Sequence, residues 1–274
     1  MCYYNGQKVT HSEFIRLKNL EKALANYDFL NMPVQSGFDY GANAVLKRIP
    51  GKMDFEIVQM EWGFLRGNPK KWPFFKTRED VSKMRSGYKD EKGKFHPSIN
   101  FLNAMGEELL LPDKVYRDAA LNRRCLILSS GFFEWRHIFP KNKRTGEPLK
   151  TAVKYPYHIG MRDKEYFYMA GISEEWTDLN TGEHVETDAI ITTAANKVME
   201  QVHNSKKRMP TILSEDLAWE WLFGNLSEER ITEIATSQVP WEEMEVYPVA
   251  KDFKTALEPA ARFTYEDLEE LELT

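Results

Sequence analysis

The chain has 274 residues and a formal net charge of −5, and 42% of its residues are hydrophobic. This composition is typical of a globular domain and excludes an intrinsically disordered chain, which would be poor in apolar residues and rich in charge. The apolar runs are much shorter than the roughly 20 residues that span a bilayer, and no basic stretch followed by an apolar one opens the sequence. We therefore expect a cytoplasmic, monomeric protein without a membrane segment.

The first predicted elements are a helix, a strand and a loop. Residues 12–27 carry apolar side chains at helical spacing behind a Ser12 cap, which predicts an amphipathic helix. Residues 54–63 roughly alternate between apolar and polar, which predicts a half-buried strand. Residues 66–98 are rich in Lys, Gly and Pro, so we expect a loop that is either a binding loop or an insertion.

The later elements indicate the fold class. Further strands are predicted at residues 124–135, 156–161, 165–173, 185–194 and 244–249. Helices are predicted at residues 113–122, 196–202, 214–222 and 227–236, and residues 141–154 are expected to form a second basic loop. Because strands outnumber helices and come in runs, we expect an α+β fold, a single domain with a β-rich, barrel-like core and peripheral helices.

Charge is unevenly distributed along the chain. Residues 251–274 hold seven acidic and three basic residues, a net of −4, which leaves −1 for residues 1–250. We expect a catalytic domain over 1–250 and an acidic extension that is helical or packed on it. Basic residues cluster at 66–78, 123–124, 141–154 and 206–208. Each cluster either contributes to a local positive groove for nucleic acid or is solvated surface charge.

Cys2 has the most distinctive chemistry. Methionine aminopeptidases generally remove Met1 before a small residue, which would give Cys2 a free α-amine beside its thiol. The reference pKa of such an amine is about 7.7–8.0 and that of a thiol about 8.5, so both are partly nucleophilic near neutral pH. This pair suits an aldehyde, because the amine forms a Schiff base and the thiol closes on the imine carbon to give a thiazolidine.

Cys125 lies inside an apolar strand and is expected to be a buried structural residue. Two cysteines without CxxC spacing are too few for a disulfide scaffold, and this favours a reducing compartment and argues against structural zinc. We expect neither a metal nor a cofactor.

Several segments after Cys2 carry a recognisable pattern in a fixed order. They are Met60-Glu-Trp-Gly-Phe64, Leu102-Asn-Ala-Met-Gly-Glu107, Cys125-Leu-Ile-Leu-Ser-Ser-Gly-Phe-Phe-Glu-Trp135, Thr192-Thr-Ala-Ala-Asn196 and Val202-His-Asn-Ser-Lys-Lys-Arg-Met-Pro-Thr-Ile-Leu213. The pattern resembles the SOS-response-associated peptidase (SRAP) family, with its Trp-Gly-Leu, Asn-Ala-Arg-Ser-Glu, Cys-Leu-x-Pro-x-x-Gly-Phe-Tyr-Glu-Trp and Ile-His-x-Arg-Met-Pro-x-Ile-Leu motifs. The resemblance covers nearly the whole chain.

The resemblance implies a DNA damage and repair protein that crosslinks itself to abasic sites in single-stranded DNA. Cys2 would attack the ring-opened sugar aldehyde, and Asn103 would orient the N-terminal residue. Glu134 would move protons at the amine and imine and serve the removal of residues that precede Cys2. His203 would be the general acid that opens the closed sugar.

The expected DNA contacts combine aromatic and basic side chains, since single-strand binders stack bases on aromatics and pair phosphates with cations. They are Trp62, Phe64, Lys70, Lys71, Trp72, Arg208, Met209 and Pro210. The chain departs from the family pattern near the expected phosphate ligands. Tyr3 and Tyr4 replace the Gly-Arg that often follows the cysteine, and Met105 replaces the arginine of Asn-Ala-Arg-Ser-Glu.

Ordinary structural roles compete with each of these assignments. Glu134 would otherwise be a surface carboxylate, His203 a loop residue, Asn103 a cap or turn residue, and Trp62 and Phe64 core residues. Two other functions also fit the sequence. One is a thiol peptidase or amidase with Cys2 as an N-terminal nucleophile, and the other is a non-catalytic single-stranded DNA-binding protein.

Overall fold

The computed structural model describes residues 2–66, 75–142 and 144–273. Its strands are β1 (Tyr4–Lys8), β2 (Phe14–Leu17), β3 (Leu20–Ala23), β4 (Asn31–Ser36), β5 (Ala42–Arg48), β6 (Phe55–Trp62), β7 (Tyr88–Lys89), β8 (Phe95–His96), β9 (Asn103–Met105), β10 (Arg124–Ser129), β11 (Gly131–Ile138), β12 (Val153–Met161), β13 (Phe167–Thr177), β14 (His184–Ala194), β15 (Arg208–Pro210), β16 (Ile212–Leu213) and β17 (Met244–Pro248). Its α-helices are α1 (Arg78–Ser86), α2 (Arg117–Asn122), α3 (Lys197–Val202), α4 (Glu215–Phe223) and α5 (Glu228–Ala235).

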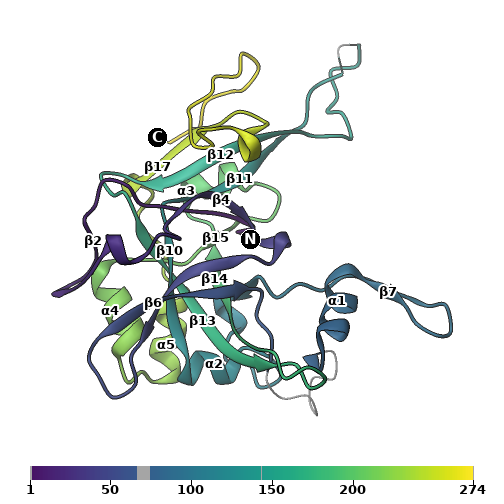
Figure 1. Cartoon of the computed structure of the whole chain (residues 1–274). Coiled ribbons are helices and arrows are strands. Elements are labelled where there is room, and N and C mark those ends of the chain that lie inside the picture. The colour runs from purple at the N-terminus through teal and green to yellow at the C-terminus, as the bar shows by residue number, and fades with distance from the viewer. Residues whose placement is uncertain (1, 67–74, 143, 274) are drawn as a thin grey trace.

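A closed ring of five strands forms the core. The strands β14, β6, β5, β10 and β13 pair in this order, and β13 pairs back onto β14. Helices α4 and α5 lie next to each other at the periphery of this ring (Figure 1). The predicted α+β class, with a barrel-like core and peripheral helices, is therefore confirmed.

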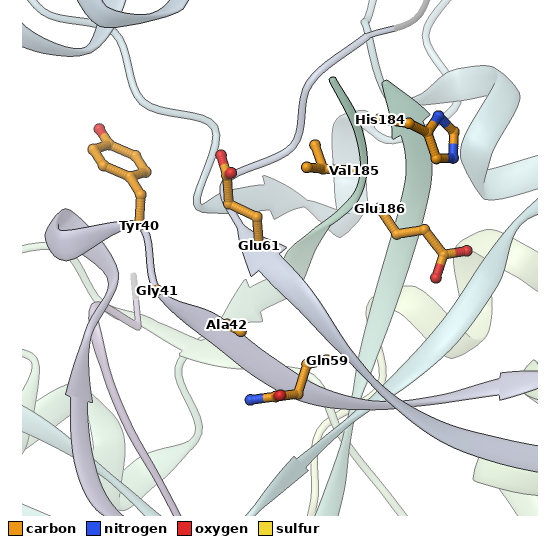
Figure 2. A pocket seen from close by; sticks show the side chains of 8 residues that line it. All are labelled: Tyr40, Gly41, Ala42, Gln59, Glu61, His184, Val185 and Glu186. Carbon is orange, nitrogen blue, oxygen red and sulfur yellow. The ribbon is translucent and has the colours of Figure 1, made fainter. Parts of the chain in front are cut away.

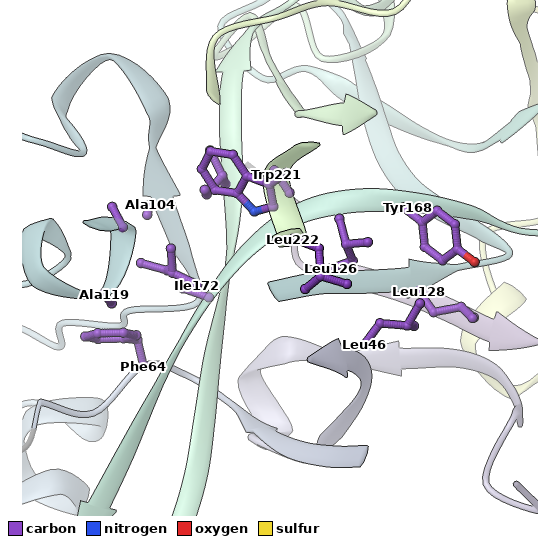
Figure 3. Close-up of a cluster of buried hydrophobic side chains, with 14 of the residues drawn as sticks. Leu46, Phe64, Ala104, Ala119, Leu126, Leu128, Tyr168, Ile172, Trp221 and Leu222 are labelled. Carbon is purple, nitrogen blue, oxygen red and sulfur yellow. The ribbon is translucent and has the colours of Figure 1, made fainter. Parts of the chain in front are cut away.

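Strand β10 shows why barrel residues are apolar on both faces. Leu126 and Leu128 pack in one cluster with Trp221 of α4 (Figure 3). Cys125 and Ile127, which alternate with them, belong to a second cluster that includes side chains of the other large sheet. Full burial of a leucine or isoleucine stabilises the fold by about 1.5–3 kcal/mol. A strand that is covered on both faces therefore appears in the sequence as an unbroken apolar run.

The second large sheet contains the N-terminal strand. Its order is β17-β12-β11-β1-β4, and its neighbouring strands pair antiparallel. Strand β1 pairs with β11 through Asn5↔Phe132 and Gly6↔Gly131. Strand β11 then continues to Ile138, beyond the start of β1. This arrangement brings the first residues of the chain beside the second half of β11.

The helix predicted over residues 12–27 is wrong, because this segment contains the hairpin of β2 and β3. Ile15 and Leu17 are buried, whereas Arg16 between them is exposed, which is the two-residue period of a strand. Lys18 at the turn has a φ of 52°, a left-handed conformation that a helix does not allow. Apolar residues three and four apart also fit two short strands joined by a turn, so their spacing alone misled the prediction.

The strand predicted over residues 124–135 is two strands, β10 and β11, which belong to different sheets. Gly131 begins β11 with a φ of 148°, and a Cβ at this position would lie 2.0 Å from Nε2 of His158. Only glycine fits such a change of direction next to another side chain. The loop predicted over residues 66–98 also contains regular structure, namely α1, β7 and β8, while residues 67–74 lie outside the described range.

The other predicted strands and helices are confirmed, with shifted boundaries. Helix α2 begins at Arg117 rather than at residue 113. Residues 251–273 contain no α-helix and pack on the second sheet, where Tyr265 donates a hydrogen bond of 2.7 Å to the carbonyl oxygen of Val249. No described helix combines the length and the apolar character needed to cross a membrane.

Candidate active site

A cleft of about 500 Å³ opens beside the second half of β11. Its lining residues are Tyr3, Glu134, Trp135, His137, Lys154, His203, Ser205, Lys206 and Lys254. They come from four separate parts of the chain: the N-terminus, the β11–β12 pair, the segment after α3 and the C-terminal region. Two of the four predicted catalytic residues, Glu134 and His203, therefore meet at one cleft.

Asn103 holds the main chain of Cys2. Its side-chain Nδ2 donates a hydrogen bond of 2.9 Å to the carbonyl oxygen of Cys2. Asn103 itself lies in β9, which pairs with β14 opposite Ile190, and its carbonyl oxygen accepts a hydrogen bond of 3.1 Å from the hydroxyl of Tyr116. A residue fixed on two sides can orient the N-terminal residue, which is the role that the resemblance implies for Asn103.

The Cys2 thiol is fully buried, with 0% of the residue exposed. Burial raises the pKa of this thiol far above its ordinary range, and the nearby Glu134 raises it further. The partly ionised thiol expected from the sequence is therefore not present in this environment. The thiol must lose its proton during the reaction rather than before it.

Glu134 and His203 form a buried pair, with 3.8 Å between Oε2 of Glu134 and Nε2 of His203. Burial raises the pKa of Glu134 to about 8, because a carboxylate is poorly solvated there. Burial also lowers the pKa of His203 to about 4. Near neutral pH the carboxyl is therefore mostly protonated and the imidazole is neutral.

The hydrogen bond of His203 to the main chain fixes its tautomer. Nδ1 lies 2.8 Å from the carbonyl oxygen of Arg208. A carbonyl oxygen only accepts, so Nδ1 must carry the proton and donate it. Nε2 is then the unprotonated nitrogen, and it faces Glu134. Because 3.8 Å exceeds the length of a hydrogen bond, transfer of a proton from Glu134 to His203 requires a closer approach or a bridging water.

Asn204 holds His203 at this position, and the sequence did not single it out. Its Oδ1 accepts a hydrogen bond of 3.0 Å from the N–H of His137, and its Nδ2 donates one of 2.8 Å to the carbonyl oxygen of the same residue. The amide of Asn204 thus pairs with β11 as a neighbouring strand would. The only available signal was its place next to His203, among residues that are additional to the family motif.

None of the predicted DNA contacts that fall within the described residues lines the cleft. Trp62 and Phe64 are 0% exposed, and the indole N–H of Trp62 donates to the carbonyl oxygen of Leu102 at 3.0 Å. Met209 and Pro210 of β15 are also buried. Burial argues against stacking of bases on Trp62 or Phe64 and favours the competing interpretation, in which both are core residues. Lys70, Lys71 and Trp72 lie outside the described residues.

Arg208 is engaged within the protein. Its guanidinium donates two hydrogen bonds of 2.8 Å to the carboxylate of Glu107 and another of 2.6 Å to the carbonyl oxygen of Thr192. Such a bidentate pair leaves little of the guanidinium for a phosphate. Contact of Arg208 with DNA stays a prediction that this geometry does not favour.

A second cleft, of about 580 Å³, lies across β6 and β14 (Figure 2). Its acidic residue Glu61 forms ion pairs with Arg78 at 2.9 Å and Arg85 at 2.8 Å, and Glu186 forms one with Lys47 at 2.6 Å. Its charges are thus neutralised within the protein. Among the described residues, no group of three or more His, Cys, Asp or Glu side chains is arranged to hold a metal ion.

Fold and site together define a class of protein: an α+β domain with a five-stranded barrel, in which a buried thiol near the N-terminus lies beside a carboxyl–imidazole pair. The model of the SOS response associated peptidase (SRAP) family matches residues 42–256. The chain therefore belongs to the SRAP family, as its motifs indicated. Cys2 precedes the matched range.

Relatives in this family have related names. The chain is 29% identical over 162 residues to the abasic site processing protein YoqW of Bacillus subtilis, which covers 59% of this chain and 63% of YoqW. It is 27% identical over 145 residues to the abasic site processing protein YedK of Escherichia coli, which covers 53% of this chain and 58% of YedK. Each alignment thus spans less than two thirds of the relative's own length.

The fold also matches solved structures. A crystal structure of a protein from Bacteroides thetaiotaomicron superposes with a TM-score of 0.68 at 22% identity, which covers 96% of this chain and 100% of that chain. At this identity the likeness concerns the fold alone.

Proposed function

We propose that this protein processes abasic sites by forming a covalent thiazolidine crosslink between Cys2 and the sugar aldehyde in single-stranded DNA. The observation that carries the proposal is the placement of Glu134 and His203 as a buried carboxyl–imidazole pair near a Cys2 whose carbonyl oxygen is held by Asn103. Family membership and the names of the relatives support abasic-site processing as the function.

The reaction requires Cys2 to be the first residue, so Met1 and anything else that precedes Cys2 must be removed. The closed sugar then opens. The bond between C1 and the ring oxygen breaks, and the ring oxygen takes a proton from His203. The anomeric hydroxyl becomes the aldehyde as it gives its proton to the carboxylate that Glu134 carries after protonating His203. His203 is neutral at rest, so it must first receive the proton of Glu134 on Nε2.

The amine of Cys2 next bonds to C1, and the carbonyl oxygen leaves as water to give the imine. Glu134 carries both protons of the amine nitrogen to the departing oxygen, one after the other, and ends in its starting protonation state. Sγ then bonds to C1, and the thiol proton ends on nitrogen. Aminothiol and aldehyde thus give a thiazolidine and one water, with no oxidant or metal needed to balance the reaction.

The buried thiol also separates this proposal from the alternative of a thiol peptidase or amidase that acts on other molecules. Such an enzyme keeps a reactive thiolate in an electropositive site, whereas burial keeps the thiol of Cys2 protonated. Removal of residues that precede Cys2 is a self-directed step and needs no standing thiolate, so it remains part of the proposal.

The test is an adduct that survives denaturation. Wild-type protein mixed with a single-stranded oligonucleotide that carries one abasic site should give a heat-stable band on a denaturing gel, and intact-mass analysis should show Cys2 as the first residue. Cys2→Ala should give no such band, because it lacks the sulfur that closes the ring. Cys125→Ala is the matched control, since it removes the other buried thiol, and it should still react.

Two results would overturn the proposal. Wild-type yields of adduct from Cys2→Ala would exclude a thiazolidine at this residue. Reversible binding by the wild type, with no covalent product at any time, would favour the non-catalytic single-stranded DNA-binding protein.

A further inference from the structure

Most arginines in the basic clusters of the sequence are neutralised by the fold. Arg66 and Arg123 both lie within 3.2 Å of carboxylate oxygens of Asp118 and Glu174. Arg124 donates its hydrogen bonds to main-chain carbonyl oxygens instead. The arginines that the structure describes in the clusters at 66–78 and 123–124 are therefore engaged within the protein, whereas Lys76 of the first cluster is exposed.

Three lysines of the cleft beside β11 differ from these arginines in their exposure and in their ion pairs. Lys154, Lys206 and Lys254 all line the cleft, and all three are exposed. None of them forms an ion pair with a carboxylate in the described part of the chain. The cleft thus has three positive charges at its rim, while the two acid–base groups within it are the buried Glu134 and His203.

Three distant segments bring these lysines together. Lys154 lies in β12 directly opposite His137 of β11. Lys206 follows His203 in the loop whose N–H groups bond back to the His203 carbonyl oxygen. Lys254 lies in the short 3₁₀ helix Phe253–Thr255, after β17.

Lys254 reaches the N-terminal strand itself. Its Nζ donates a hydrogen bond of 2.6 Å to the hydroxyl of Tyr4, and it lies 4.2 Å from the centre of the Tyr4 ring and 5.4 Å from that of Trp135. A neutral hydroxyl and two aromatic faces hold the ammonium without cancelling its charge. Lys254 is therefore held next to Tyr4, two residues after Cys2 in the chain, and its charge remains available to an anion.

The lysines also lie close enough to act on the two histidines of the cleft. Burial lowers the pKa of His137, and Lys154 lowers it further. Burial is the main cause of the lowered pKa of His203, the charge of the N-terminus is the next, and His137 and Lys206 contribute less. Burial by itself gives both shifts this sign, so the position of the lysines at the cleft carries the argument.

We infer that Lys154, Lys206 and Lys254 form the phosphate-binding site of this protein and hold the backbone on either side of the reacting nucleotide. This inference rests on the proposed function and adds the DNA-contacting residues. Lysines suit this task because an ammonium is a compact charge that accepts many phosphate orientations, unlike the planar fork of arginine. Trp135, which is partly exposed in the same cleft, offers an aromatic face next to the sugar.

The experiment measures reversible binding of a fluorescent single-stranded oligonucleotide that carries a tetrahydrofuran abasic analogue, which has no aldehyde and cannot crosslink. The test protein is the triple variant Lys154→Gln, Lys206→Gln, Lys254→Gln. The matched control is the triple variant Lys52→Gln, Lys94→Gln, Lys164→Gln, which removes the same charge from exposed lysines that do not line the cleft.

Anisotropy titrations at several salt concentrations give the dissociation constant and its salt dependence. Each phosphate contact contributes a slope of about −0.7 for single strands, so loss of three contacts should flatten the slope by about 2 and weaken binding on the order of 100-fold near 0.1 M salt. The control triple should bind like the wild type.

The inference would be overturned if the triple variant of Lys154, Lys206 and Lys254 (the cleft triple) kept the wild-type affinity and salt dependence. Equal losses in this variant and in the control triple would also overturn it, because net charge alone would then explain them. Equal competition by poly-glutamate and by the oligonucleotide would also overturn it, since the site would then bind any polyanion. The proposed function is tested by a different result. It fails if the wild type forms no adduct with DNA that carries a true abasic site, even where loss of binding by the triple variant of the cleft lysines supports the inference.

Discussion

Two clefts of similar size, one across β6 and β14 and one beside β11, show which features distinguish a candidate active site from an ordinary surface cleft. The cleft across β6 and β14 measures about 580 Å³ and the cleft beside β11 about 500 Å³. In the first, Glu61 and Glu186 are paired with cations. In the second, the pKa of Glu134 is raised and that of His203 is lowered, and Lys154, Lys206 and Lys254 at the rim have no carboxylate partner among the described residues. Unbalanced charge and perturbed titration, rather than volume, mark the candidate active site.

A buried carboxyl is common to both regions, so burial alone does not mark function either. Asp188 lies on β14, two residues from Glu186 at the first cleft, and burial raises its pKa well above the ordinary range as it does for Glu134. Asp188 accepts a hydrogen bond of 2.9 Å from the amide of Asn43 and has 0% exposure. Glu134 differs because it faces an imidazole and a cleft. Proton transfer to a substrate needs both.

The largest effect should come from the acid–base pair itself. We expect Glu134→Gln and His203→Ala to slow single-turnover crosslinking by about 10²–10⁴-fold, the usual contribution of positioned acid–base groups. End-point yields would hide such losses, so time courses are needed. Glu61→Gln, at the other cleft, should react at the wild-type rate. A large loss from Glu61→Gln would break the contrast between the two clefts.

The two members of the pair should fail at different steps. An aldehyde that is already open does not need the ring-opening acid, so it should rescue His203→Ala and leave Glu134→Gln slow. Equal defects on closed and open substrates would contradict this division of labour.

Asn204 should have a smaller effect, because it positions His203 and does not touch the sugar. Asn204→Ala loses both hydrogen bonds to the main chain of His137, and we expect crosslinking of the closed sugar to slow about tenfold. Asn142→Ala is the matched control, since Asn142 also makes two side-chain bonds to the main chain, in the β11–β12 loop.

A purely structural role for Asn204 would lower the melting temperature without altering substrate preference. The positioning role predicts a second readout: the open aldehyde should rescue Asn204→Ala as it rescues His203→Ala. Equal slowing on both substrates would exclude this role.

The smallest effect concerns Asp188 and is one of stability rather than rate. Its pKa is raised in the folded protein, so its stabilising contribution is full below the unfolded pKa of about 3.9 and declines as pH rises toward the folded pKa. Asp188→Asn keeps the shape but cannot ionise. Between pH 5 and pH 8 its free energy of unfolding should therefore rise relative to that of the wild type.

Chemical denaturation at the two pH values measures this difference. Asp163→Asn, at an exposed turn, should show no such gain. Crosslinking by Asp188→Asn should match the wild type where both proteins are folded, and a rate loss as large as that of Glu134→Gln would assign Asp188 to the chemistry.

The sequence by itself determined the residue types of the candidate site. A cysteine at position 2, with an asparagine, a glutamate and a histidine in ordered motifs, was sufficient to identify the SRAP family and to nominate Cys2, Asn103, Glu134 and His203. It also indicated most strands and helices, because apolar runs and helix caps are local signals. These inferences depend on neighbours in the chain, which the sequence displays directly.

Only the tertiary structure decided where protons and free charges lie. A pKa depends on burial and on groups brought close by folding, so neither the protonated Glu134 nor the neutral His203 was visible in the sequence. Arg208 is neutralised by Glu107, which lies 101 positions away, whereas Lys254 reaches Tyr4 across 250 positions. A charged side chain is available to a partner only when no such distant residue has paired with it. This is why the basic clusters of the sequence supply only some of the free charges of the cleft, Lys154 and Lys206, while Lys254 comes from outside the clusters.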